Sequence, residues 1–66
     1  MFKVFKLITG QESSLLSGTA PSKAEAVVLA ETEVGTYPEH GYNDEHGFFW
    51  GRHDGDQKQV RVWIER

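Results

Sequence analysis

Three histidines lie beside carboxylates in the second half of the chain, and these residue types can bind a divalent metal ion. Imidazole nitrogen and carboxylate oxygen are both zinc ligands, although the spacing here forms no helical ligand pair such as His-Glu-x-x-His. Asp, Asn, His and Gly also gather in turns, because they cap or tolerate unusual backbone angles. The candidate metal ligands are His40, His46, His53, Asp54 and Asp56, and turn formation is the alternative interpretation.

A second group with binding chemistry combines aromatic rings and guanidinium groups near the C-terminal end. Its members are Phe48, Trp50, Arg52, Arg61 and Trp63. Such side chains are enriched at the centres of protein interfaces, and they can also stack the bases of single-stranded nucleic acid. The formal net charge of −3 opposes nucleic acid, because attraction to phosphates needs a basic surface. We therefore favour a protein partner, most simply a second copy of the chain.

A β-hairpin must position these aromatic and basic residues. Asp54-Gly55 lies between two aromatic and β-branched segments, which is the strongest short-range signal for a hairpin turn. Period-two geometry places the aliphatic positions 60, 62 and 64 on one face, with Arg61 and Trp63 on the other. An even number of loop residues puts Phe48, Trp50 and Arg52 on the face of Trp63; a three-residue loop with a bulge would reverse this. We expect the even loop.

The remaining segments predict two further strands and one helix. Residues 2–8 alternate as a strand with apolar side chains on both faces, and residues 13–19 return as a weaker strand. Ser22 and Glu25 form a capping box at the start of a helix. Its apolar stripe consists of Ala26, Val27, Ala30 and Val34. Gly35 is expected to end the helix as a left-handed cap, and residues 36–46 read as a long polar connection.

These elements predict one α+β domain spanning residues 1–66, in the order β-β-α-β-β. One helix packs on one face of a three- to four-stranded, antiparallel-rich sheet. A single helix covers a single face, so Phe48, Trp50 and Trp63 form an aromatic surplus on the other. The alternative is that these rings pack under the polar connection through Tyr37 and Tyr42.

Composition narrows the function classes. The chain has no cysteine, which excludes disulfides, thiolate catalysis and cysteine-ligated zinc. Residues 26–30 form the longest apolar run, far short of a membrane span, and lysines interrupt the N-terminal segment where a signal peptide would be apolar. No nucleophile has a base nearby in the sequence, and a domain this small has little room to enclose a pocket of about 300 Å³. We expect a soluble, cytoplasmic, non-enzymatic protein that has no cofactor and does not associate with membranes.

The charges are segregated along the chain. Residues 24–51 contain six carboxylates and no Lys or Arg, whereas the rest holds seven Lys and Arg against four carboxylates. A two-fold dimer could bring basic chain ends against acidic middles. The sequence thus predicts a small interaction module that uses its aromatic sheet face, with single-stranded nucleic-acid binding and a histidine–carboxylate metal site as the alternatives.

Overall fold

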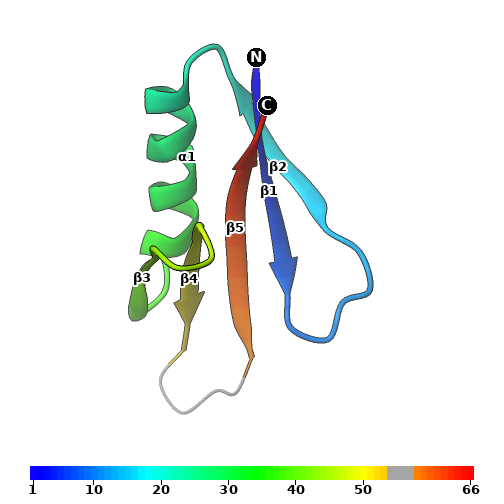
Figure 1. Ribbon diagram of the computed structural model, residues 1–66. Helices are drawn as coiled ribbons and strands as arrows, with labels where there is room; N and C mark the ends of the chain where they lie inside the picture. Colours follow the sequence, from blue (N-terminus) through cyan, green and yellow to red (C-terminus); the bar gives the residue numbers. More distant parts are fainter. Residues whose placement is uncertain (54–57) are drawn as a thin grey trace.

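The computed structural model describes residues 1–53 and 58–66, and within them the chain forms one helix and five strands. In chain order the elements are β1 (Phe2–Ile8), β2 (Leu15–Ala20), α1 (Lys23–Gly35), β3 (Glu39–Asn43), β4 (Phe48–Arg52) and β5 (Gln59–Glu65). The strands form one antiparallel sheet in the order β2-β1-β5-β4-β3, and α1 packs along one side of it (Figure 1). The predicted α+β class is confirmed, but the sheet has five strands instead of three or four.

The additional strand, β3, lies inside the segment predicted to be a polar connection. Its residues are polar or small on both faces, so hydrophobic alternation gives no strand signal there. Pairing with β4 specifies the strand instead, in the register Glu39–Arg52 to Asn43–Phe48. Residues 44–47 form the turn between them, where Gly47 adopts a positive φ of 74° and donates its N–H to the Asn43 carbonyl at 2.8 Å.

The core lies between α1 and the central strands. Its buried side chains are Val4, Ala20, Ala26, Ala30, Val34, Val60 and Val62. Alanines on the inner face of α1 bring the helix close to the valines of β1 and β5. Each fully buried valine contributes roughly 1.5–3 kcal/mol of gross hydrophobic stabilisation. The predicted aliphatic face of β5 is thus the core face.

The start of α1 agrees with the predicted cap, and its end does not. The Ser22 Oγ accepts the Glu25 N–H at 3.3 Å. At the other end the helix continues through Gly35, and Thr36 is the C-cap in the right-handed region, so the prediction of a left-handed Gly35 was wrong. The Thr36 hydroxyl donates to the Glu33 carbonyl at 3.1 Å and satisfies one of the terminal acceptors. Among the described residues, no helix combines the length and the apolar character that crossing a bilayer requires.

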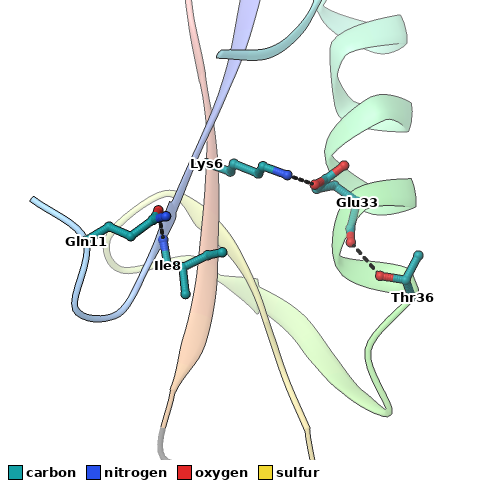
Figure 2. Close-up of polar contacts among 5 residues, drawn as sticks. All are labelled: Lys6, Ile8, Gln11, Glu33 and Thr36. Atoms are coloured by element: carbon teal, nitrogen blue, oxygen red, sulfur yellow. Dashed lines mark hydrogen bonds and ion pairs between the residues drawn. The ribbon is translucent and has the colours of Figure 1, made fainter. Parts of the chain in front are cut away.

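An ion pair ties α1 to β1 across the core face of the sheet. The Lys6 Nζ lies 2.9 Å from the Glu33 Oε1, and Figure 2 shows the lysine reaching from the strand to the helix. The hydrogen bond and the charge of Glu33 raise the pKa of Lys6 above its ordinary value of 10.5. This pair fixes the helix at its C-terminal half, next to the last core residue, Val34.

The central strand β5 holds the two halves of the sheet together. It pairs with β1 from Lys3–Glu65 to Ile8–Val60, and with β4 from Phe49–Val62 to Arg52–Gln59. On one side lies the pair β2-β1, and on the other the pair β4-β3. The N- and C-terminal ends of the chain consequently lie beside each other at one end of the sheet (Figure 1).

Candidate interaction face

The sheet register places the predicted aromatic and basic residues together on the face opposite α1, here called the open face. Trp50 lies opposite Arg61, and Phe49 lies opposite the buried Val62. Because side chains alternate, Phe48, Trp50 and Arg52 project from the same face as Arg61 and Trp63. The pair Arg52–Gln59 closes the register and leaves six residues between its members, an even number. Asp54-Gly55, the predicted turn, lies outside the described residues.

A row of large apolar side chains crosses four neighbouring strands of the open face. Leu16 of β2 lies opposite Phe5 of β1, and Phe5 lies opposite Trp63 of β5. The Phe5 and Trp63 rings stack with centroids 6.1 Å apart and planes 24° from parallel. One step beyond the pair Phe49–Val62, the same register places Phe48 of β4 beside Trp63. We call Leu16, Phe5, Trp63 and Phe48 the apolar row.

A second level of side chains lies next to the apolar row, formed by Leu7, Arg61 and Trp50. The Arg61 guanidinium lies over the Phe48 ring at 5.2 Å from its centroid, a cation–π geometry. The Trp50 indole lies against Gly41 of β3, close enough that a Cβ on Gly41 would be 3.2 Å from the ring. The aromatic rings of the open face therefore come from β1, β5 and β4, with Leu16 of β2 beside them at one edge and Gly41 of β3 under Trp50 at the other.

Apart from Arg61, the charged groups of the open face lie at the two ends of the strands. Arg52 forms an ion pair with Glu39 beyond Trp50. At the opposite end, Glu65 lies opposite Lys3 and accepts the Trp63 Nε1–H at 2.9 Å. Each end thus carries a cation and an anion, and Arg61 lies between the two ends among apolar side chains.

The predicted opposition of basic ends and acidic middle does not occur on this face. Of the six carboxylates in residues 24–51, Glu39 lies on the open face and already pairs with Arg52. The others lie on α1 or in the β3–β4 turn: Glu25, Glu31, Glu33, Asp44 and Glu45. Charges that are segregated along the sequence are therefore not segregated on this face, because β1 and β5, which come from opposite ends of the sequence, lie side by side in the sheet.

The alternative in which Tyr37 and Tyr42 cover the tryptophans was wrong. The Tyr37 ring lies on Gly51, where a Cβ would approach it within 2.9 Å, and it packs against the core. Tyr42 packs on Phe49 with ring centroids 4.7 Å apart. Both tyrosines belong to the side of α1, so the rings of the open face shield one another instead. Phe5, Phe48, Trp50 and Trp63 are each partly buried, while Leu16 is 56% exposed.

Phe5, Leu7 and Leu16 were not among the predicted interface residues. The sequence did place Phe5 and Leu7 on one face of a strand, opposite Val4, which is buried. Their neighbours across the sheet depend on strand order, which alternation does not specify. Leu16 reaches the open face through a register shift between Val4 and Phe5, a local irregularity that has no sequence signal here.

The predicted metal ligands do not gather among the described residues. The His40 Nδ1 lies 3.0 Å from the Tyr37 carbonyl oxygen, and His53 packs on the Tyr37 ring at 5.1 Å. His46 stacks on Phe48 at the opposite end of β4, about 13 Å away along a five-residue strand. Within residues 1–53 and 58–66 no three His or carboxylate groups are placed to hold one ion. Asp54 and Asp56 lie outside the described residues, and the metal site remains an untested prediction.

Comparison with known protein families, with curated proteins and with solved structures finds no match to this chain. The fold and the open face are therefore the basis for a functional proposal. The strongest feature is the apolar row, which is built from strands far apart in sequence. Arg52 pairs with Glu39 at one end of the strands, and Lys3 lies opposite Glu65 at the other.

Proposed function

We propose that this chain is a non-enzymatic interaction module that pairs with a second copy of itself through the open face. The observation that carries the proposal is the apolar row on the face opposite α1. Four strands place large apolar side chains side by side there: Leu16, Phe5, Trp63 and Phe48. Small soluble domains seldom expose a contiguous apolar patch of this kind unless it binds something.

The two levels of the open face are complementary to each other under two-fold symmetry. The proposed two-fold axis lies in the plane of the interface, parallel to the apolar row and midway between the row and the second level. It places the apolar row of one copy over the second level of the partner. Trp63 then lies over the partner's Arg61, and Phe48 lies over the partner's Trp50. The first contact is a cation–π pair and the second an aromatic pair, and symmetry repeats both. A second copy is therefore a better occupant than a flat apolar surface, which would leave Arg61 unpaired across the interface.

The size of the face predicts a weak dimer. Strands about 4.8 Å apart and about 20 Å long give an apolar area of roughly 20 Å by 20 Å. This is about 400 Å² per copy in projection, below the roughly 600–1,000 Å² per partner that stable specific interfaces bury. We expect a dissociation constant in the micromolar range or weaker, so the dimer forms in a concentration-dependent way.

Sedimentation equilibrium over a concentration series tests the proposal with matched variants. Leu16→Lys places a charge in the apolar row, and Val28→Lys makes the same change on the outer face of α1, where the valine is 60% exposed. Leu15→Lys is a second control, because Leu15 lies on the other face of β2 and is 49% exposed. We expect Leu16→Lys alone to remove the dimer. Loss of association in Leu15→Lys as well would instead indicate pairing through the β2 edge.

Truncation of Trp63 measures the strength of the central contact. A buried aromatic anchor typically contributes about 2 kcal/mol to association, so Trp63→Ala should weaken the dimer about 30-fold. Circular dichroism must show that the variant remains folded, since Trp63 also stacks on Phe5. A wild-type chain that stays monomeric at millimolar concentration would refute self-association through this face.

Single-stranded nucleic acid is the second candidate partner. It is favoured by two guanidinium groups interleaved with rings, Arg61 over Phe48 at 5.2 Å and Arg52 over Trp50 at 6.0 Å. It is opposed by the net charge of −3 and by the engagement of Arg52 with Glu39. We rank it below the protein interface for that reason.

A further inference from the structure

A groove runs between α1 and the edge strand β3, on the face of the sheet opposite the apolar row. It consists of two adjoining hollows of about 500 and 410 Å³. Glu31, Tyr42 and Phe49 line both of them. Val27 and Ile64 complete the apolar wall of the larger hollow. A domain of this size has little room to enclose a pocket of about 300 Å³, and these two hollows are open along one side instead of enclosed.

The groove arises from the unequal lengths of the paired elements. β4 begins at Phe48, and its register with β5 begins at Phe49–Val62, so Ile64 lies beyond the part of β5 that pairs with β4. α1 continues past that point toward Lys23, leaving a gap between the helix and the hairpin. The aromatic side chain of Tyr42, 51% exposed, stands at the open rim.

The strand beside the groove has a free edge. β3 is the last strand of the sheet and pairs with β4 alone. An edge strand presents backbone N–H and C=O groups that can pair with another extended chain. Strand addition next to a helix-lined groove is a recurrent way to bind peptides: the backbone gives affinity and the groove selects alternate side chains.

The charge of the groove indicates which peptide fits. Glu31 lies midway between the hollows, and among the described residues it forms no ion pair. Asp44 and Glu45 lie in the turn that follows β3, and residues 24–51 contain no Lys or Arg. Among the described residues that line the hollows, Lys23, at the far end of the larger one, is the one Lys or Arg, and His40 lines the smaller one. A basic side chain is therefore favoured at the middle of the groove.

We infer that this groove binds an extended peptide as an additional strand beside β3, with aliphatic side chains in the two hollows and a Lys or Arg facing Glu31. The side chains that enter the groove are at every second position, about 7 Å apart. Three such positions match the length of the five-residue β3. This site is on the opposite face of the sheet from the apolar row and does not depend on the proposed dimer.

A designed peptide, acetyl-Thr-Leu-Thr-Arg-Thr-Leu-Thr-amide, tests the inference by amide NMR titration of the intact chain. We expect saturable shifts in β3 and around Glu31. Glu31→Lys should weaken binding about three- to tenfold, whereas Glu12→Lys, the same charge change away from the groove, should not. A peptide with Glu in place of Arg should reverse this preference and bind Glu31→Lys more tightly than wild type. Leu16→Lys, on the open face, should bind the original peptide normally.

N-methylation of the peptide separates strand addition from simple contact with the groove. In an added strand, alternate amides point toward β3, and the others point to solvent. Methylating one set should abolish binding, and methylating the other set should leave it intact. Equal effects of the two sets, absence of saturable shifts in β3, or an unreversed charge preference would each overturn the inference.

Discussion

Gly51 and Gly41 lie on adjacent strands, and each supports an aromatic ring on a different face of the sheet. A Cβ added to Gly51 would lie 2.9 Å from the Cδ1 and 3.0 Å from the Cγ of Tyr37. A Cβ added to Gly41 would lie 3.2 Å from the Cζ2 and Nε1 of Trp50. The two positions have similar steric geometry and differ in how far the ring can move, so their alanine variants form a matched pair.

We predict that Gly51→Ala is clearly destabilising. Tyr37 packs against the core, and its N–H donates to the Val34 carbonyl at 3.0 Å directly after the helix, so its ring cannot withdraw freely. Overpacking of this kind costs about 1–3 kcal/mol, and replacing glycine in a strand returns about 0.5–1 kcal/mol. The net loss lies between zero and about 2.5 kcal/mol, with about 1 kcal/mol as the central value, which lowers the melting temperature by roughly 4–8 °C in a domain of this size.

Gly41→Ala should be nearly neutral in stability, because Trp50 lies on the open face and its indole can shift by a few tenths of an ångström. Its signature is a changed tryptophan emission with a free energy of unfolding within about 0.5 kcal/mol of wild type. Urea unfolding followed by circular dichroism and fluorescence measures both quantities. In a Tyr37→Ala background the cost of Gly51→Ala should shrink, since the obstructing ring is gone. Equal stability of Gly51→Ala and Gly41→Ala would refute the reasoning.

Three further predictions concern the ion pair, the helix cap and the open face. The raised pKa of Lys6 means that its pair with Glu33 stabilises the fold fully below about pH 10.5, and that this contribution is lost as the pH rises through the higher pKa of the folded state. Both side chains are about one-third exposed, so we expect wild type to lose only about 0.5 kcal/mol more than Lys6→Met in strongly alkaline urea titrations; parallel curves would contradict this. Ser22→Ala should lower the free energy of unfolding by about 1 kcal/mol through loss of the N-cap, whereas Ser22→Asp should retain it. Short single-stranded DNA at low ionic strength should leave the emission of Trp50 and Trp63 unchanged; salt-sensitive quenching would favour the nucleic-acid candidate.

The elements that the sequence predicts are those whose hydrophobic period matches their final environment. The alternation of β5 and the stripe of α1 correspond to the core, and the even number of residues between Arg52 and Gln59 explains why the faces of β4 were assigned correctly. β3 differs, because His40 and Tyr42 alternate with Glu39, Gly41 and Asn43, a pattern without an apolar face. A local signal for its turn does exist: the Asn43 Oδ1 accepts the His46 N–H at 3.0 Å.

The candidate surfaces likewise divide into parts that local sequence patterns predict and parts that depend on how the strands are arranged. The aromatic and basic members of the open face could be predicted because they alternate within one hairpin. The apolar row could not, since it joins Leu16 to Phe48 across strands whose order local patterns do not determine. The groove beside β3 depends on where β4 begins relative to Ile64, a difference in element length that no residue type encodes.

The central position of β5 has a consequence for synthesis on the ribosome. β5 follows both hairpins in the sequence and lies between them in the sheet, and neither two-stranded unit is stable by itself in water. The chain therefore has to remain without its sheet until β5 has left the exit tunnel, and folding then requires contacts between its first and last residues, which slows it. During that interval Phe5, Phe48 and Trp50 are accessible to chaperones and to other nascent chains. A chain whose synthesis stops before residue 59 lacks the strand that joins the two hairpins and would therefore have no stable sheet.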